Sequence, residues 1–539
     1  MRILHVGHPA VVPALRRLGH EVVAAAEVAP EVVVAGRPFD LGALWRRLTP
    51  AADLLFVADA LGRQPLGVGV ETITAPRLYW AIDVHLNFFW QRHYAHLFDL
   101  TLVAQRDYVP FFAADGIPAR WLPWGVDETV FRDLGIARTH AVSFVGLVDP
   151  VTRPKRTAII ERLRRRMAIA TFGETLARRL PPGDVAWVLS QTAVALNECI
   201  LGDLNFRVFE AMACGAMLLT EHIGNGLTDL FTPGVHLDVF GPDDLEAKAD
   251  HYVRHAAERA RIAASGSDEV HRRHTMTHRM ADVVALVADG IPRRDTRQDA
   301  ALHLGLAAHG MAVRGLVDPE PACRVAIERL RPALLEDGRA EAGLAVGEML
   351  AWVGRDEGAL TILGASRRID PGDLRAWLLA SRIALRRGDS VTATRLAHEG
   401  LASARHVSSA TRAAAEAALP AGIDHPACLH ALGVALREAG HPFTAGLVRQ
   451  VGADLPATAL EYHTRAFEQD PRLAAAATEA GAVLEAAGLP EFAVQFDAAA
   501  ARLAPEDHAI RDALARTLAR SYRGPAAVAG AATRPALVS

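Results

Sequence analysis

Two hydrophobic patterns divide this 539-residue chain near residue 290, and they constrain its fold more than any other feature. Up to residue 290, short apolar runs alternate with amphipathic stretches. Strands that alternate with helices in this way predict parallel sheets covered by helices on both faces. From residue 291 onward the periodicity is helical, and the sequence is rich in Ala, Leu, Arg and Glu without a convincing strand. The predicted fold class is therefore α/β followed by all-α.

The α/β pattern occurs twice, in residues 1–135 and again in residues 136–290. The predicted strands of the two copies, in chain order, are 2–6, 21–25, 54–58, 100–104, 141–145, 168–172, 194–197 and 217–220. The segment 122–135 contains Pro, Gly and Asp and has the composition of an interdomain linker. Two consecutive Rossmann-like domains imply a cleft between them, and such folds bind ligands at the carboxyl ends of their strands.

An internal period of 34 residues (505 − 471) marks the all-α part, where it separates Pro471 from Pro505. The same spacing or a similar frame relates Ala459 to Ala493 and Ala466 to Ala500, and includes Gly347, Gly354, Ala359, Pro371, Trp377, Gly388 and Ala393. Small residues at helix crossings and a proline after the second helix resemble tetratricopeptide repeats. The resemblance implies a helical superhelix over residues 336–525. Residues 291–335 are expected to form a helical linker, and residues 526–539 a disordered tail.

Composition and charge exclude several classes of function. The net charge is −4 at pH 7, which provides no basic field for nucleic acid. No segment reaches the ~18 uncharged apolar residues of a membrane span, and the N-terminal sequence lacks the pattern of a signal peptide. We therefore expect a cytoplasmic protein that binds no nucleic acid and spans no membrane.

The sequence offers little support for a bound metal. Its four cysteines are far apart, without the spacing of metal ligands. His271, His274 and His278 recur on one face of a predicted helix and raise zinc as an alternative. No acidic ligand or further histidine accompanies them, so we expect no metal site.

The segment 202–216, GDLNFRVFEAMACGA, carries the most informative polar residues. A polar turn leads into a helix whose Glu210 is expected near its start, at the edge of the cleft. A carboxylate there suits the paired hydroxyls of a ribose, and free N–H groups at a helix start suit phosphate.

This segment resembles the donor-nucleotide site of GT-B glycosyltransferases, in particular the CgeB-like spore-maturation group of the family-4-like superfamily. Upstream, SFVGLVDPVTRPKR and AVALNEC are similar to that group's FVG…R segment and to its apolar strand ending in Asn. Downstream, the group's closing "G…HT…R" pattern is matched by Gly266, His274, Thr275 and Arg279. The resemblance covers residues 140–285 well and the first 135 residues in outline.

The resemblance implies a donor site for a nucleotide-diphosphate sugar, without metal or other cofactor. Glu210 would bind the ribose, and Asn205 and Arg207 would lie beside the diphosphate. The remaining donor-site residues implied are Gly146, Arg153, Lys155 and Arg156, the cations neutralising the diphosphate. Many retaining relatives carry a second Glu in an E-x7-E pattern, but that position is Gly202 here, followed by Asp203. The sugar and the stereochemical outcome are therefore left open.

In the first domain, the segment YWAIDVHLNFFWQRHY places polar groups among aromatic residues. Asp83 and His85 are two residues apart, so in an extended segment both would face the same side. The resemblance places this segment near the cleft. Asp83 or His85 is then the candidate general base on an acceptor hydroxyl, or holds the donor sugar. Gly7, after the first predicted strand, is a candidate for close approach of the backbone to substrate.

The leading hypothesis is an enzyme that transfers a sugar from a nucleotide-diphosphate sugar to an acceptor. Helical repeats offer a concave surface suited to extended peptide, so a protein side chain is the expected acceptor. Three alternatives stay open: an inert GT-B unit in a repeat scaffold, a transferase acting on a polysaccharide or lipid, and a sugar-nucleotide epimerase. The repeats could instead mediate self-association into a homo-oligomer.

Overall fold

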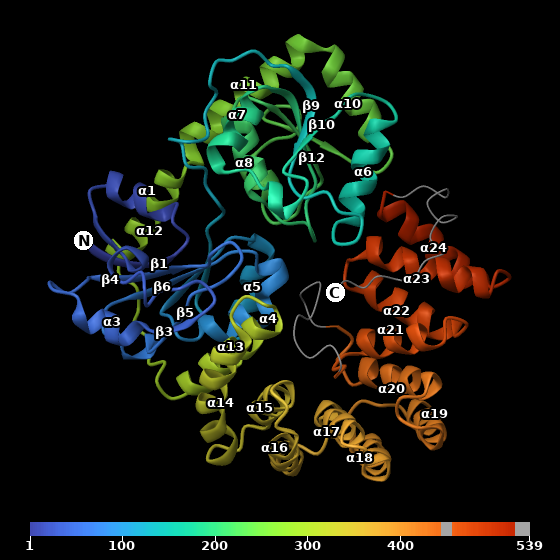
Figure 1. Ribbon diagram of the computed structural model, residues 1–539. Helices are drawn as coiled ribbons and strands as arrows, with labels where there is room; N and C mark the ends of the chain where they lie inside the picture. The colour runs from blue at the N-terminus through green and yellow to red at the C-terminus, as the bar shows by residue number, and fades with distance from the viewer. Residues whose placement is uncertain (444–454, 523–539) are drawn as a thin grey trace.

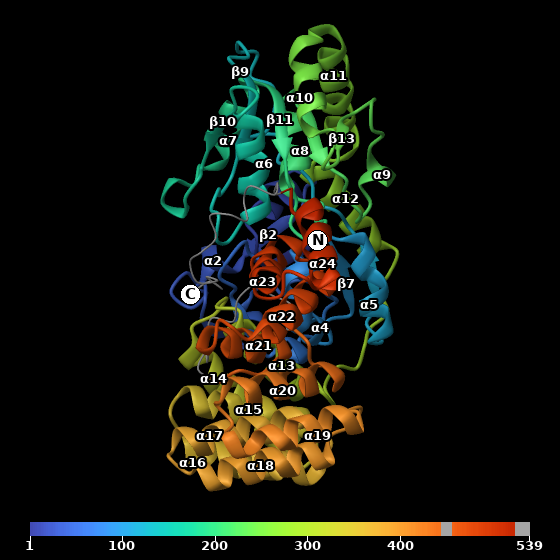
Figure 2. The same cartoon turned by 90° about the vertical axis from the view of Figure 1, so that its right-hand side faces the viewer.

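The computed structural model describes residues 1–443 and 455–522, so the predicted disordered tail, residues 526–539, lies outside the described residues. Two α/β domains are followed by helices that form an arc from the first domain towards the second (Figure 1). Viewed from the side, the second α/β domain lies at one end of the molecule and helices α15 to α19 lie at the other (Figure 2).

The first domain is built on a six-stranded, entirely parallel sheet in the order β2-β1-β4-β6-β7-β8. Its strands are β1 (Arg2–Gly7), β2 (Glu21–Ala24), β4 (Leu54–Ala58), β6 (Arg77–Ala81), β7 (Leu100–Val103) and β8 (Ala119–Trp121), with β3 (Pro38–Asp40) and β5 (Leu66–Val68) paired separately. Its helices are α1 (Val11–Arg17), α2 (Ala25–Val28), α3 (Leu41–Arg47), α4 (Val84–Ala95) and α5 (Val109–Ala114).

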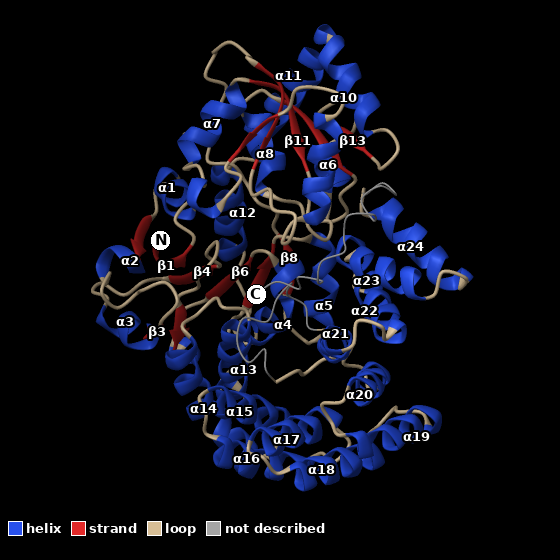
Figure 3. Ribbon diagram, turned by 45° about the vertical axis from the view of Figure 1, so that its right-hand side comes forward, coloured by secondary structure: helices blue, strands red, loops and turns tan. Residues whose placement is uncertain are grey.

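The second domain has a five-stranded parallel sheet in the order β10-β9-β11-β12-β13. Figure 3 shows its strands with helices around them. Its strands are β9 (His140–Val145), β10 (Ala170–Phe172), β11 (Thr192–Asn197), β12 (Met217–Glu221) and β13 (Asp238–Phe240). Its helices are α6 (Pro154–Arg164), α7 (Pro182–Ser190), α8 (Phe206–Ala213), α9 (Leu227–Leu230), α10 (Leu245–Arg254), α11 (Ala256–Arg273) and α12 (Met276–Ala288). Helix α12 returns to the first domain and packs on α1. The predicted pair of parallel-sheet domains is confirmed.

Beyond α12, the described residues are helical, as predicted, and consecutive helices pack on one another. The helices are α13 (Ala300–Val313), α14 (Pro319–Leu335), α15 (Ala340–Trp352), α16 (Asp356–Ile369), α17 (Leu374–Arg386), α18 (Ser390–Ser403), α19 (Ser409–Ala418), α20 (Pro426–Glu438), α21 (Ala459–Gln469), α22 (Ala474–Ala486), α23 (Pro490–Leu503) and α24 (His508–Arg520). Glycine allows close crossing: a Cβ on Gly347 would lie 2.6 Å from the Leu363 side chain, and one on Gly400 2.5 Å from Trp377. The tetratricopeptide assignment stays a prediction.

The segment expected to be a linker, residues 291–335, contributes α13 and α14 to the core of the first domain. One hydrophobic cluster contains side chains of the first sheet, of α4 and of α13 to α15. The contact of α13 with α4 is close enough that a Cβ on Gly310 would lie 2.6 Å from the Cβ of Trp90. The first domain and the start of the all-α part therefore share one core.

A buried ionic network joins the same two parts of the chain. The side chains of Arg77 and Asp99 are 2% and 0% exposed and lie 2.8 Å apart. Asp99 also lies 2.6 Å from Arg293, and Arg77 donates to Thr296. Breaking a buried pair by removing one partner strands the other charge, so this network ties the chain after α12 to the first sheet.

Histidines at the contact between α4 and α13 predict acid sensitivity. His93 Nδ1 lies 3.4 Å from His303 Nδ1, and burial, with the charges of nearby groups, lowers the pKa of both to about 3. Both histidines are therefore neutral in the folded protein. Below about pH 6.5 they take up protons in the unfolded chain but not in the folded one, so the free energy of unfolding decreases as the pH falls. We expect the urea midpoint to fall between pH 7 and 5, and to fall less in His303→Gln. The exposed His398→Gln on α18 is the control, and an equal pH dependence in all three proteins would contradict the assignment.

Candidate active site

The carboxyl ends of the two sheets face each other across an interdomain cleft, and loops of the two domains meet there. After β7, Gln105 accepts a hydrogen bond from the Leu204 amide at 2.8 Å. Next to it, Asp107 accepts one from the Asn225 amide at 2.9 Å. These contacts hold the loops that follow β7, β11 and β12 together, in the position where such folds bind ligands.

On the second domain, β9 and α8 place three of the predicted donor residues together. Gly146 follows β9 with φ +147°. Arg207 donates to the carbonyl of Val145 and lies 3.4 Å from Glu210. Burial raises the pKa of Glu210 although Arg207 opposes the shift. Glu210 is in the second half of α8 and not near its start, because the helix begins only at Phe206.

Lys155 and Arg156 are paired with two carboxylates, Glu198 and Glu221, that were not among the predicted site residues. Lys155 Nζ lies 3.4 Å from Glu198 and 3.2 Å from Glu221, and Arg156 Nε lies 2.6 Å from Glu198. Burial alone would raise the pKa of Glu198, but the charges of Arg156 and Lys155 outweigh it and hold that pKa below its usual range. The sequence does contain a sign of these two carboxylates, because each lies at the carboxyl end of an apolar strand: Glu198 follows β11 and Glu221 ends β12.

Arg153 and Asn205 differ from these paired residues, because each has a buried side-chain atom without a partner. Arg153 precedes α6, and its Nε makes no hydrogen bond. Asn205 precedes α8, and its Oδ1 likewise has no partner. Arg153 Nε can therefore donate, and Asn205 Oδ1 accept, a hydrogen bond with a bound ligand or water.

Asp83 and His85 form the opposite wall of the cleft, but not in the extended segment that was expected. Asp83 has a left-handed backbone, with φ 52°, and immediately precedes α4, so His85 lies in the first turn of that helix. The expectation of two side chains on one face of a strand is therefore wrong, since β6 already ends at Ala81. The unusual backbone of Asp83 is a strain of the kind that clusters at functional sites.

The electrostatics of this wall suit proton transfer and hydrogen bonding. Burial raises the pKa of Asp83, and the nearby Asp203 carboxylate adds to the rise while His85 opposes it. Burial lowers the pKa of His85 to about 4, so the imidazole is neutral at pH 7. His85 Nε2 lies 4.0 Å from Asp203 of the second domain, and its Nδ1 is buried without a partner. Burial also raises the pKa of Asp203 to about 7.

Gly7 is placed by packing between strands. Its φ is +110°, and a Cβ there would lie 1.7 Å from the carbonyl oxygen of Ala58. Only glycine fits where β1 approaches β4 so closely. Packing of β1 against β4 therefore explains why residue 7 is a glycine without any contact to substrate.

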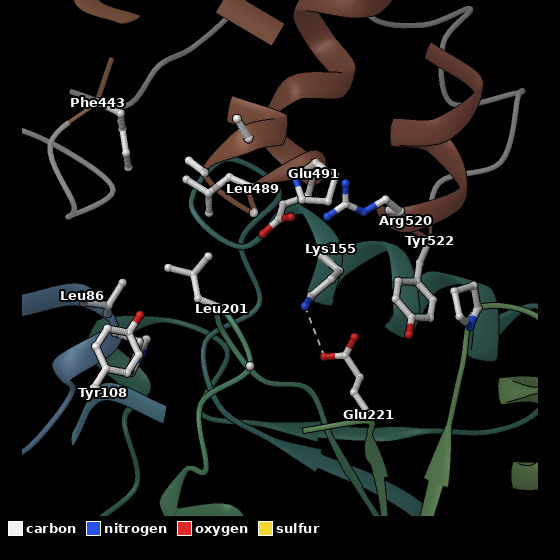
Figure 4. A pocket seen from close by; sticks show the side chains of 17 residues that line it. Leu86, Tyr108, Lys155, Leu201, Glu221, Phe443, Leu489, Glu491, Arg520 and Tyr522 are labelled. Carbon is white, nitrogen blue, oxygen red and sulfur yellow. Dashed lines mark ion pairs between the residues drawn. The ribbon is translucent and has the colours of Figure 1, made fainter. Parts of the chain in front are cut away.

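A cavity of about 800 Å³ adjoins the cleft, and all three parts of the chain line it (Figure 4). His85, Leu86 and Tyr108 come from the first domain. The second domain contributes Lys155, Leu201, Gly202, Glu221 and Pro242, and the helical part contributes Phe443, Ala486, Ala487, Gly488, Leu489, Pro490, Glu491, Arg520 and Tyr522. The end of the helical arc is anchored there by Tyr522, which packs into the core of the second domain.

The three histidines considered for zinc do not converge. His271 contacts the carbonyl of Ala213, His274 contacts Arg279, and His278 contacts Thr275. Across residues 1–443 and 455–522, no group of three or more His, Cys, Asp or Glu side chains is arranged to hold a metal. In the same residues, no helix combines the length and the apolar character needed to cross a bilayer.

Comparison with solved structures finds distant likenesses. Sucrose-phosphate synthase from Thermosynechococcus elongatus is 12% identical with a TM-score of 0.38, and the match covers 54% of this chain and 99% of that one. HepE from Anabaena, solved with UDP-glucose, is 13% identical with a TM-score of 0.38, covering 54% and 100% of the two chains. A glycosyltransferase from Rickettsia africae is 9% identical with a TM-score of 0.38, covering 53% and 98%. No curated protein matches the chain. Residues 153–285, which run from the start of α6 into α12, match the family described as "Glycosyl transferase-like".

Proposed function

We propose that this protein is a glycosyltransferase that moves a sugar from a nucleotide-diphosphate sugar to an acceptor. The observation that carries the proposal is the contact between the carboxyl ends of the two sheets. In the segments that follow their strands, Arg153 Nε and Asn205 Oδ1 of the second domain and His85 Nδ1 of the first are buried without a hydrogen-bond partner. The family match supports it, because the matched segment contains Arg153, Asn205 and Glu210.

Each wall has its own role in the proposed reaction. On the second domain, Glu210 binds the ribose, and Arg153 and Asn205 bind the diphosphate. Positive charge there stabilises the nucleoside diphosphate as negative charge develops on it during bond cleavage. On the first domain, the Asp83 carboxylate takes the proton of the acceptor hydroxyl, and neutral His85 hydrogen-bonds the transferred sugar.

The cavity beside the cleft is proposed as the acceptor site, and a protein side chain as the acceptor. The support is that Leu489, Glu491 and Tyr522, from the end of the helical arc, line this cavity together with His85 of the first domain. A surface of stacked helices suits an extended polypeptide. A polysaccharide or lipid acceptor would not need a wall built by this part of the chain.

Release of nucleoside diphosphate, measured with a panel of donor sugars that begins with UDP-glucose, tests the proposed activity. Slow hydrolysis of one donor is expected without acceptor. Calorimetry that shows no binding of any nucleotide sugar would instead support an inert scaffold.

Activity is expected to survive EDTA, because protein cations neutralise the diphosphate in this proposal. The measurement is the turnover number before and after removal of divalent ions. Strict dependence on Mg²⁺ or Mn²⁺, restored by adding the ion back, would contradict this role of the arginines.

Replacing Glu210 by Ala is expected to weaken donor binding by about 1.5–3 kcal/mol, which is roughly 10- to 150-fold, because a charge-assisted hydrogen bond to the ribose is lost. Calorimetric titration with the best nucleoside diphosphate measures the change. Glu161→Ala, on the exposed face of α6, is the control. Equal affinities of a folded Glu210→Ala protein and the unsubstituted protein would remove Glu210 from the site.

A further inference from the structure

The first helix of the all-α part ends beside the cleft. Helix α13 runs antiparallel to α4: His303 contacts His93 and stacks on His96 at 3.8 Å between ring centroids, and Gly310 packs against Trp90. Moving forward along α13 thus means moving backward along α4. Four residues beyond Gly310, this register brings Arg314 to the first turn of α4, where His85 lies.

Hydrogen bonds fix the chain that follows α13 at this edge of the first domain. The Arg314 amide donates to the carbonyl of Gly310 at 3.1 Å. The carbonyl of Leu316 accepts from the Gln64 amide at 2.8 Å, and the Asp318 amide donates to Gly36 at 2.6 Å. Gln64 lies in the loop after β4, at the carboxyl edge of the sheet, so the backbone of Arg314 is held next to the cleft.

The side chain of Arg314 is only partly exposed, and its guanidinium group forms no ion pair within the described residues. Its Nε is buried without a hydrogen bond. Asp83 is close enough to oppose the lowering of the Arg314 pKa that burial causes. Burial and the charge of Arg156 lower the pKa of Arg153, and the charge of Arg314 lowers it further. Arg314 acts on Arg153 from the opposite wall.

The other cations of the second domain's wall are already neutralised. Lys155 and Arg156 are paired with Glu198, and Arg207 is paired with Glu210. Within residues 1–443 and 455–522, Arg153 and Arg314 are thus the cleft cations that have a buried, unpaired Nε and no carboxylate partner. The two walls that carry these cations meet where His85 Nε2 lies 4.0 Å from Asp203. An anion bound between two cations that lack an ion-pair partner is stabilised by both.

We propose that Arg314 and Arg153 bind one diphosphate group from opposite walls of the cleft, so that the end of α13 completes the donor site. This inference rests on the proposed function, because the diphosphate is that of the nucleotide sugar. A guanidinium presents several N–H donors in a plane and suits phosphate oxygens. Bound diphosphate then links the two walls of the cleft, since each contributes one of the cations.

The test compares a nucleoside diphosphate with its nucleoside, using the full-length protein and the base that binds best in a panel. In Arg314→Gln, affinity for the diphosphate is expected to fall about tenfold or more while nucleoside affinity is unchanged. Arg314→Lys is expected to recover part of the loss. The control is Arg324→Gln on α14, where the exposed Arg324 is paired with Glu320. Wild-type diphosphate affinity in a folded Arg314→Gln protein would overturn the proposal, and so would equal losses for both ligands.

Inorganic pyrophosphate separates this proposal from the proposed function. If no nucleotide binds but pyrophosphate does, and its binding needs both Arg153 and Arg314, the anion site stands and the glycosyltransferase proposal fails. If nucleotides bind independently of Arg314, the proposed function stands and this inference fails. Absence of pyrophosphate and nucleotide binding by the unsubstituted protein would overturn both.

Discussion

A chain that ends at Gly290 is expected not to fold, although both α/β domains would be complete by sequence. The truncation removes α13 to α15, whose Leu304, Met311 and Leu330 are at most 1% exposed and belong to the core of the first domain. Burying one such side chain stabilises a fold by roughly 1.5–3 kcal/mol, and several are lost at once. A typical total stability is only about 5–15 kcal/mol.

The loss of the ionic network adds to this effect. Without Arg293, the buried Asp99 keeps only Arg77 as an ion-pair partner, and the loop before α13 no longer covers the pair. Soluble yield, thermal melting and binding of a hydrophobic dye measure the outcome. A soluble 1–290 chain with a cooperative melting transition would contradict the shared core.

A chain that ends at Arg405 is the matched comparison. It keeps α13 to α18 and the core of the first domain, and removes the end of the helical arc that lines the cavity. Because helices in such arrays contact mainly their neighbours, we expect this chain to fold. It should bind and slowly hydrolyse the donor but lose transfer to the natural acceptor. Transfer at the full rate would show that the arc does not recognise the acceptor.

The strands that could be predicted are those with continuous apolar runs. Residues 54–58 coincide with β4, and residues 100–104 contain β7. Strand β6 was missed because it begins with Arg77, a residue that is unusual in a buried strand. Arg77 is satisfied there by Asp99 and by Thr296, and the second of these partners is 219 residues away. No local pattern contains that information.

The sequence indicates where in the fold the candidate site lies, but it does not show which of the charged side chains form ion pairs with one another. The segment around Glu210 does lie at the carboxyl end of the second sheet. Glu198 directly follows the predicted strand 194–197, and only the fold reveals that it neutralises Arg156 and Lys155. Arg314 could not be found from sequence at all, because its position depends on how α13 packs against α4.

Replacing Asp83 by Asn is expected to lower kcat about 10²- to 10⁴-fold, the usual contribution of a general base. Donor affinity should not fall, because the side chains that bind the diphosphate are kept and the substitution removes a negative charge near Arg314. The side chain of Asn keeps the shape of Asp but cannot take the proton of the acceptor hydroxyl. Turnover with saturating donor and acceptor, together with calorimetric donor affinity, measures the two effects separately.

The pH profile distinguishes Asp83 from His85. Because burial raises the pKa of Asp83, activity of the unsubstituted protein is expected to fall as pH drops through that raised pKa, where the carboxylate takes up a proton. His85→Gln should keep this acid limb, with weaker binding of the donor sugar, whereas Asp83→Asn should be slow at every pH. An unchanged acid limb in Asp83→Asn would assign the titration to another group.

Stereochemistry provides an independent check on the same residue. A base that activates the acceptor hydroxyl belongs to a single displacement, in which the hydroxyl attacks the anomeric carbon opposite the departing diphosphate and inverts its configuration. We therefore expect the product sugar to carry the anomeric configuration opposite to that of the donor, as read by NMR coupling constants. A product with the donor's configuration would mean that Asp83 holds the sugar instead of accepting the proton. In that case Asp83→Asn should weaken donor-sugar binding, with no selective loss of kcat.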